Sequence, residues 1–252
     1  MTDQADVHTQ QRSLDGKKTL ITGGTTGIGR AIAVLLASYG AEVFICGRDP
    51  RHLEDALQRI NEVGKGKGIA LDLADPDNVK RFFDAGLAAL GGIDVAVINA
   101  AISAGGITEL SEADLRYAIA VDFTAYLLST HAATQALKDH GDIVFIGSMS
   151  AHTLSADSSV YAGIKHGIQG FAEALRKELA PKNIKIALVE PGKTGADMQY
   201  EQYSAEEQAQ LIEKEEMLRA EDIAVAVHYI LTQPNRAIVQ QLTIAPRQQP
   251  KE

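Results

Sequence analysis

Short apolar runs rich in β-branched residues alternate along this chain with longer segments whose apolar residues recur every three or four positions. The short runs predict strands covered on both faces, at 18–21, 42–46, 67–71, 94–98, 142–146, 185–189 and 238–244. The longer segments predict helices at 28–38, 50–62, 76–89, 111–138, 158–180, 205–217 and 220–232. Alternating strands and helices indicate an α/β fold, with a parallel sheet of about seven strands and right-handed crossovers.

The two ends of the chain lack this periodicity. Residues 1–16 are predicted to form a flexible N-terminal tail, and residues 247–252 a C-terminal tail. The segment between them, 17–246, has no internal repeat and no linker, and it has a suitable length for one large α/β domain. We therefore expect a single domain.

Composition excludes several classes of protein. The formal net charge of −9 argues against nucleic-acid binding, which requires a basic surface. Cys46 is the single cysteine and the histidines have no metal-ligand spacing, so we expect no internal disulfide and no metal site. The N-terminus has no signal-peptide core, and no apolar run approaches the ~20 residues that span a bilayer. These features predict a cytoplasmic protein without membrane contact.

A glycine-rich turn follows the first predicted strand. The run Thr22–Gly29 has glycines at 23, 27 and 29 and leads directly into the helix at 28–38. Glycine permits a sharp turn and lets a ligand approach the backbone closely. The first N–H groups of the helix and its positive dipole end favour an anion at that point. The turn therefore predicts a seat for a nucleotide pyrophosphate, although its G-x-x-x-G-x-G spacing differs from the general dinucleotide fingerprint.

Small and polar residues follow the other predicted strands as well. In an open parallel sheet, ligands bind beyond the carboxyl ends of the strands. Besides the turn, the residues at those ends are Gly47-Arg48, Asp72, Asn99-Ala100-Ala101, Gly147-Ser148 and Pro191-Gly192. One edge of the sheet is therefore the expected site.

A tyrosine and a lysine four residues apart supply candidate chemistry. Tyr161 and Lys165 lie in a helical pattern, so both side chains can point into one site. A nearby ammonium stabilises phenolate, which suits the phenol to acid–base work on an alcohol or carbonyl. Ser148, at a strand end, can hydrogen-bond the same substrate oxygen. The alternatives are an ordinary surface pair and a loop serine.

Together these segments resemble the short-chain dehydrogenases/reductases, over about residues 15 to 245. The matching motifs, in the family's order and at its spacings, are Thr22–Gly29, Asp72, Asn99-Ala100-Ala101, Ser148, Tyr161, Lys165 and Pro191-Gly192. The resemblance implies a single-domain, Rossmann-type, doubly wound fold. It also implies an NAD(P)(H)-dependent oxidoreductase that interconverts a secondary alcohol and a ketone.

The resemblance also implies residue roles. Tyr161 would be the proton donor or acceptor, Lys165 would lower its pKa and bind the nicotinamide ribose, and Ser148 would polarise the carbonyl. The turn would hold the pyrophosphate, Asp72 the adenine, and Asn99 the adenosine-side ribose region. The complete set of implied coenzyme contacts is Gly23, Thr25, Thr26, Gly27, Ile28, Gly29, Arg48, Asp72, Leu73, Asn99, Ala100, Ala101, Tyr161, Lys165, Pro191, Gly192 and Thr194.

Arg48 indicates which nicotinamide coenzyme is used. An acidic residue just beyond the second strand would bind a ribose 2′-OH and repel a 2′-phosphate. This chain has Gly47-Arg48 there, and a guanidinium can pair with phosphate through two N–H groups. We therefore predict NADP(H) rather than NAD, the alternative being a surface arginine that orders the loop.

The chain departs from the family pattern at the position of its catalytic asparagine, which is Asp122 here. In the family that asparagine usually holds a water in a relay that reaches the lysine. A carboxylate can accept a hydrogen bond from water but donates one only when protonated. We expect an altered relay with a shifted pH optimum, or a weakened catalyst. After Pro191-Gly192 the usual threonine is Ala196, and Thr194 could contact the nicotinamide amide instead.

Several substrate contacts and two rival functions are compatible with the sequence. Ser150, His152 and Met198 are candidate substrate contacts, and the segment at about 193–217 is expected to cover the substrate. The resemblance implies a homotetramer or homodimer with helices 111–138 and 158–180 at the interface. The first rival is a catalytically weak NADP(H)-binding sensor, favoured by Asp122 and Ala196. The second is a nucleotide-sugar epimerase or dehydratase, which would need a larger C-terminal domain.

Overall fold

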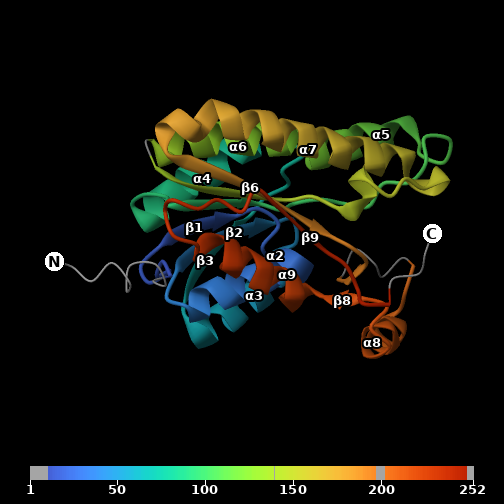
Figure 1. Cartoon of the computed structure of the whole chain (residues 1–252), viewed down its shortest axis with the longest axis horizontal. Helices are drawn as coiled ribbons and strands as arrows, with labels where there is room; N and C mark the ends of the chain where they lie inside the picture. The colour runs from blue at the N-terminus through green and yellow to red at the C-terminus, as the bar shows by residue number, and fades with distance from the viewer. Residues whose placement is uncertain (1–10, 139, 197–201, 249–252) are drawn as a thin grey trace.

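Parallel strands form a seven-stranded central sheet in the order β3-β2-β1-β4-β5-β6-β9 (Figure 1). Their bounds are β1 Lys18–Ile21, β2 Glu42–Gly47, β3 Lys65–Ala70, β4 Val95–Ile98, β5 Gly141–Ile146, β6 Ile184–Pro191 and β9 Gln241–Ile244. The computed structural model describes residues 11–138, 140–196 and 202–248. Because every pair of neighbouring strands in this sheet is parallel, the carboxyl ends all meet at one edge, and the strand order reverses between β1 and β4.

Helices cover both faces of the sheet (Figure 1). The upper layer contains α4 Pro76–Leu90, α5 Glu112–Ile119, α6 Ala125–Leu137 and α7 Ser159–Leu179. The lower layer contains α2 Gly27–Ser38, α3 Pro50–Val63 and α9 Ala220–Leu231. Beyond the sheet, α8 Ala205–Glu213 lies next to a short parallel ribbon of β7 Thr194–Gly195 and β8 Leu218–Arg219. This arrangement confirms the predicted single-domain, doubly wound α/β fold.

The period of two along the strands divides the core into two apolar layers. Leu20 packs in the upper layer with Phe82 of α4, whereas its neighbour Ile21 packs in the lower layer with Ile32 of α2. Alternate residues of a strand point to opposite faces, so both faces of β1 are apolar and both are covered. Burial of each such side chain contributes about 1.5–3 kcal/mol, which holds the sheet and its loops in place.

Side-chain caps fix where several helices begin. Asp75 precedes Pro76, and its carboxylate accepts a hydrogen bond from the Asp77 N–H at 3.0 Å. Ser204 and Glu207 form the predicted capping box at the start of α8, with the Ser204 N–H donating to Glu207 Oε2 at 2.7 Å. These local sequence signals therefore operate as expected.

The predicted helix at 111–138 is divided in the structure. Between α5 and α6, residues Ala120–Thr124 form a π-helical segment. A π-helical turn has i→i+5 hydrogen bonds, and the prediction of one continuous helix did not include it. This segment contains Asp122, so the irregularity falls at a candidate catalytic residue.

Two C-terminal elements are shorter than predicted. The helix at 205–217 ends at Glu213, because Glu215 takes the left-handed conformation at φ 61° and Leu218 pairs with Thr194 in the ribbon. The last strand begins at Gln241 instead of residue 238. The segment before it is held by Lys185, whose ammonium donates to the carbonyls of Pro234 and Ala237 at 3.1 and 2.8 Å.

Part of the predicted N-terminal tail packs against the domain. The Arg12 N–H donates to the Thr232 carbonyl at 2.9 Å, and the Arg12 guanidinium forms an ion pair with Asp142 at 3.0 Å. Leu14 is buried in the lower layer. Residues 1–10 and 249–252 lie outside the described residues, and near the C-terminus Arg247 pairs with Glu215 at 2.7 Å.

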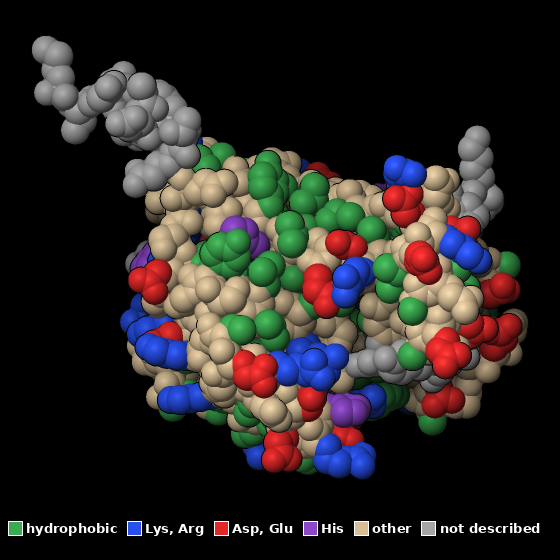
Figure 2. Space-filling model, turned by 90° about the horizontal axis from the view of Figure 1, so that it is seen from below, with side chains coloured by type: hydrophobic (Ala, Val, Ile, Leu, Met, Phe, Trp, Pro, Cys, Tyr) green, Lys and Arg blue, Asp and Glu red, His purple; other side chains and the backbone are tan. Residues whose placement is uncertain are grey.

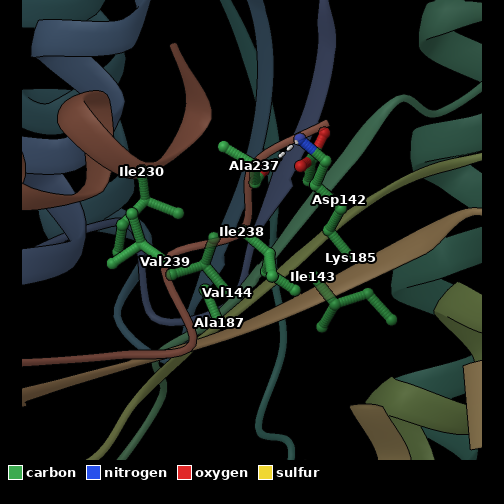
Figure 3. Close-up of a pocket in the computed structure, with 9 residues that line it drawn as sticks. All are labelled: Asp142, Ile143, Val144, Lys185, Ala187, Ile230, Ala237, Ile238 and Val239. Atoms are coloured by element: carbon green, nitrogen blue, oxygen red, sulfur yellow. Dashed lines mark hydrogen bonds between the residues drawn. The ribbon is translucent and has the colours of Figure 1, made fainter. Parts of the chain in front are cut away.

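The edge of the sheet opposite the carboxyl ends has a small cavity (Figure 3). It lies between β5, β6 and the segment before β9, with Asp142 and Lys185 among its lining residues. Its volume of about 10 Å³ accommodates roughly one water molecule. The cavity is therefore too small for a coenzyme or a substrate.

The lower face of the molecule exposes several large apolar side chains. Figure 2 shows apolar groups there among charged ones. Tyr39 at the end of α2 and Val225 and Tyr229 on α9 are exposed, at 53%, 58% and 49%.

No helix in the described ranges is long and apolar enough to cross a membrane.

Candidate active site

The glycine-rich turn leaves no room for side chains where the sequence predicts a pyrophosphate. Gly23 and Gly27 have φ angles of 65° and 49°, which favour glycine. A Cβ at Gly29 would lie 2.1 Å from the Gly23 carbonyl oxygen. Within the described part of the chain, Thr26 at the start of α2 makes no side-chain capping hydrogen bond. The first N–H groups of α2 therefore remain available to an anion, and the turn fits a phosphate group.

Asn99 braces this turn from the neighbouring strand. Its side-chain amide donates to the carbonyls of Thr22 and Gly23, each at 3.1 Å. The backbone N–H groups of Asn99 and Ala100 both donate to the Thr22 hydroxyl, at 2.8 and 3.1 Å. Asn99 therefore fixes the conformation of the turn from the end of β4, a contact that the sequence did not indicate.

Arg48 and Asp72 are joined through a tyrosine at the ends of β2 and β3. The Arg48 guanidinium donates to the Tyr117 hydroxyl at 2.6 Å, and that hydroxyl donates to Asp72 Oδ2 at 2.9 Å. The guanidinium carbon also lies 5.8 Å from the centre of the Tyr117 ring. Sequence reasoning identified Arg48 and Asp72 but missed Tyr117, which reaches them from α5.

Lys165 and Tyr161 meet inside the molecule, as their spacing on α7 predicts. Lys165 is 2% exposed, and its ammonium lies 5.3 Å from the centre of the Tyr161 ring and 5.2 Å from that of Tyr126. It also donates to the Ile146 carbonyl at 3.4 Å, an oxygen that accepts the Tyr126 hydroxyl at 2.8 Å. Strand β5 and the start of α6 thus hold Lys165 in position.

Ser148 lies beside this pair at the end of β5. Its hydroxyl accepts the Ser150 N–H at 3.1 Å and donates to the Ser150 hydroxyl at 3.1 Å. A hydrogen bond between Ser148 and Tyr161 lowers the pKa of the phenol. The structure therefore brings the serine, the tyrosine and the lysine of the predicted catalytic set together.

Asp122 is the fourth member of this cluster and is fully buried. Its Oδ1 accepts the Ile102 N–H at 2.8 Å, while Oδ2 has no hydrogen-bond partner among the described residues. Burial raises the pKa of Asp122 to about 6, although Lys165 and the Ile102 N–H oppose this shift. Asp122 can therefore change its protonation state in a weakly acidic medium.

Burial and Asp122 also determine the pKa of Tyr161. Burial raises it above the ordinary value of 10.0 and the negative charge of Asp122 raises it further, whereas the Ser148 hydrogen bond lowers it. The net shift of the Tyr161 pKa is therefore upward, and the expected lowering of this pKa by Lys165 stays a prediction. The pKa of Lys165 is itself lowered by burial, against the opposing effect of Asp122.

Asp122→Asn is expected to remove a titration near pH 6 from the pH profile of kcat/KM. The neutral amide no longer raises the pKa of Tyr161. Profiles measured for both proteins between about pH 5 and 10 check this, and overlapping profiles would contradict it. In thermal melts, the parent should lose stability relative to Asp122→Asn as the pH rises from about 4 through about 6, because folding raises the Asp122 pKa.

The family of this chain is decided by its match to a family model. Residues 17–207 match the model of the short chain dehydrogenases, which is most of the chain. This chain belongs to the short-chain dehydrogenase family.

Individual relatives agree with this assignment. The 3-oxoacyl-(acyl-carrier-protein) reductase FabG of Aquifex aeolicus is 34% identical over 190 residues, covering 73% of this chain and 77% of that protein. A short-chain dehydrogenase from Burkholderia cenocepacia, solved in complex with NADP, superposes with a TM-score of 0.84 at 30% identity, covering 93% of this chain and 98% of that one. A single-substitution variant of actinorhodin polyketide ketoreductase, solved with NADPH, superposes with a TM-score of 0.83 at 27% identity, covering 91% of this chain and 96% of that one.

This short-chain dehydrogenase has a buried glutamate that the sequence reasoning missed. Glu190, next to Pro191 at the end of β6, is fully buried. Its carboxylate contacts His152 Nε2 at 2.9 Å and accepts the side-chain amide of Gln241 at 2.5 Å and the hydroxyl of Thr243 at 3.3 Å. The predicted strand ended at residue 189, whereas β6 extends to Pro191, so the burial of Glu190 was not expected. Glu190 thus joins His152, a candidate substrate contact, to β9.

Glu190→Ala is expected to lower the free energy of unfolding by about 1–3 kcal/mol, because the amide and hydroxyl donors lose their buried acceptor. The exposed Glu178→Ala is the matched control and should change stability by less than about 0.5 kcal/mol. Urea denaturation of both variants measures the difference. Equal effects for the two substitutions would show that the hydrogen bonds of Glu190 contribute little to stability.

The segment predicted to cover the substrate is only partly described. Met198 lies outside the described residues, whereas Thr194 is buried and its hydroxyl donates to the Gly192 carbonyl at 2.9 Å. Lys193 donates to the Tyr203 hydroxyl at 2.8 Å, and its ammonium lies 4.0 Å from the centre of that ring.

In the described ranges, no cluster of His, Cys, Asp and Glu could hold a metal ion.

Proposed function

We propose that this oxidoreductase interconverts a secondary alcohol and a ketone with NADP(H) as the coenzyme. The observation that carries the proposal is the cluster of Ser148, Tyr161 and Lys165, in which a hydroxyl and a phenol are hydrogen-bonded beside a buried ammonium. The cluster lies at the carboxyl edge of the sheet, where ligands of such folds bind.

Two parts of the expected coenzyme site, the glycine-rich turn and Arg48, support the choice of NADP(H). The turn at Gly23–Gly29 can accept phosphate groups without steric obstruction. Arg48, at the end of β2, offers a guanidinium to a 2′-phosphate. The NADP and NADPH complexes of the Burkholderia enzyme and of actinorhodin ketoreductase agree with this choice. We also propose that Asp72 and Leu73 lie against the adenine.

The chain's own residues define how a proton would move. Bound NADP(H) supplies or takes up a hydride. Tyr161 would donate its phenolic proton to the carbonyl oxygen, which Ser148 holds by a hydrogen bond. Because the pKa of Tyr161 is above 10.0, the phenol carries its proton at neutral pH, as an acid in ketone reduction must. The Lys165 ammonium would stabilise the phenolate that remains.

A second candidate function is NADP(H) binding without efficient catalysis. Asp122 favours it, since this carboxyl raises the pKa of Tyr161 and leaves Oδ2 without a hydrogen-bond partner among the described residues. Such a protein would act as a sensor of NADPH. It would share the coenzyme site with the proposed enzyme and differ only in turnover.

The test is a screen of NADPH oxidation over ketones, ketoacids and ketosugars, combined with calorimetric measurement of NADPH and NADH binding. Turnover of any carbonyl class together with tighter NADPH binding supports the proposal. NADPH binding without turnover across the panel supports the sensor. Tighter binding of NADH than of NADPH would refute the coenzyme assignment.

We further propose a homodimer or homotetramer whose interface includes the α5–α6 region and α7. Ile119 at the end of α5 is 41% exposed in the single chain, which leaves apolar surface for a partner. Light scattering of the purified protein measures its oligomeric state.

A further inference from the structure

A tyrosine in α5 connects the two polar side chains at the adenosine end of the proposed coenzyme site. The Tyr117 hydroxyl accepts from Arg48 at 2.6 Å and donates to Asp72 Oδ2 at 2.9 Å, so its donor and one acceptor position are both used. Arg48 follows β2 and Asp72 follows β3, and these strands are neighbours in the sheet. Tyr117 therefore bridges two strand ends from outside the sheet.

The bridge keeps the guanidinium and the carboxylate apart. If Asp72 paired with Arg48 directly, the carboxylate would occupy the planar set of N–H groups that suits a phosphate. In the structure Nη1 of Arg48 is directed to Tyr117, and Asp72 uses its other oxygen, Oδ1, to accept the Ala74 N–H at 2.9 Å. A guanidinium has five N–H groups, so the N–H groups of Arg48 that do not bind Tyr117 can bind an anion.

The phenol stays neutral in this bridge. Burial and the hydrogen bond to Asp72 raise the pKa of Tyr117 above its ordinary value of 10.0, while Arg48 opposes the shift. The neighbouring acid, Asp49, is occupied elsewhere: it caps α3 and pairs with Arg51 at 2.9 Å. Asp72 and Asp49, the two acidic residues near Arg48, are thus each bound to another group.

The contact with Tyr117 can orient the Arg48 guanidinium, and this affects ligand binding because the Arg48 side chain is exposed. A long exposed side chain loses conformational freedom when it binds a ligand, and a contact that orders it beforehand reduces that cost. The Tyr117 hydroxyl and ring both contact the guanidinium, at 2.6 Å and 5.8 Å. The tether holds the guanidinium at the end of β2 before any ligand arrives.

We propose that Tyr117 is a positioning residue that sets the preference for NADP(H) by holding Arg48 ready for the 2′-phosphate. The inference rests on the proposed coenzyme. It assigns to an α5 side chain a selectivity that would otherwise be attributed to Arg48 alone.

Two adenosine ligands isolate the 2′-phosphate without any catalytic step. Adenosine 2′,5′-bisphosphate and adenosine 5′-monophosphate differ only in that group, and calorimetry measures the affinity of each. Tyr117→Phe retains the ring but removes the hydroxyl. It is expected to weaken bisphosphate binding by about 3- to 10-fold and monophosphate binding by less than about 2-fold. Tyr229→Phe, on the exposed surface of α9, is the matched control and should alter neither affinity.

A double-mutant cycle tests whether Tyr117 acts through Arg48. In an Arg48→Leu background, Tyr117→Phe should cause no further loss of bisphosphate affinity. Equal weakening of both ligands, or the same loss in both backgrounds, would overturn the Tyr117 proposal while leaving NADP(H) use intact. If the parent protein binds the two ligands equally, the proposed coenzyme preference fails, and the role of Tyr117 fails with it.

Discussion

Tyr161→Phe is expected to reduce kcat by about 10²- to 10⁴-fold while leaving NADPH binding nearly unchanged. The substitution removes the only atom of this side chain that can transfer a proton. It retains the ring that lies 5.3 Å from the Lys165 ammonium. The buried lysine therefore keeps its packing, and the loss reports on chemistry rather than on folding. Steady-state kinetics on the best substrate of the screen, together with calorimetry of NADPH, measures both quantities.

The control for this prediction is another tyrosine-to-phenylalanine substitution. Tyr229 is 49% exposed on α9, and Tyr229→Phe should retain parental kcat. If Tyr161→Phe also retains parental kcat, the phenol is not the proton donor and the proposed mechanism is wrong. If Tyr161→Phe loses NADPH binding as well, the tyrosine contributes to the coenzyme site and the kinetic loss cannot be assigned to proton transfer alone.

Arg48→Asp is expected to weaken NADPH binding by about 10²-fold and to change NADH binding by less than about 3-fold. A charge-assisted hydrogen bond contributes about 1.5–3 kcal/mol, and the new carboxylate adds repulsion against a 2′-phosphate. The same carboxylate can accept a ribose 2′-OH, which explains why NADH binding is retained. The ratio of kcat/KM for the two coenzymes measures the change in preference.

A control substitution with the same change in charge separates a local effect at Arg48 from the effect of the net charge of the protein. Arg236 is exposed and lies in the segment before β9, at the opposite edge of the sheet from Arg48. Arg236→Asp changes the net charge by the same amount and should leave the coenzyme preference unchanged. Equal losses of NADPH affinity in both variants would show that Arg48 acts through overall charge and not as a phosphate ligand. Increasing salt concentration should weaken NADPH binding to the parent more than to Arg48→Asp.

Local sequence signals were sufficient for the elements and for part of the site. The β-branched runs predicted strands because a sheet covered on both faces requires apolar residues at successive positions, as in Val95–Ile98. The i, i+4 spacing of Tyr161 and Lys165 predicted that they share a helix face, because helix geometry depends only on neighbours along the chain. The glycine-rich turn was recognisable for the same reason, since its backbone angles restrict which residues it can contain.

Contacts between distant segments were decided only by the tertiary structure. Tyr117 lies 45 residues from Asp72 in the chain, and nothing in the sequence around it indicates that its hydroxyl reaches two strand ends. The position of Asp122 in a π-helical segment, and the burial that raises its pKa to about 6, depend on how α5 and α6 pack over the sheet. The same packing raises the pKa of Tyr161, through burial and the charge of Asp122. Spacing and periodicity describe neighbours along the chain, whereas burial and long-range charge are properties of the folded molecule. The candidate catalytic groups could therefore be predicted from the sequence, but their electrostatics could not.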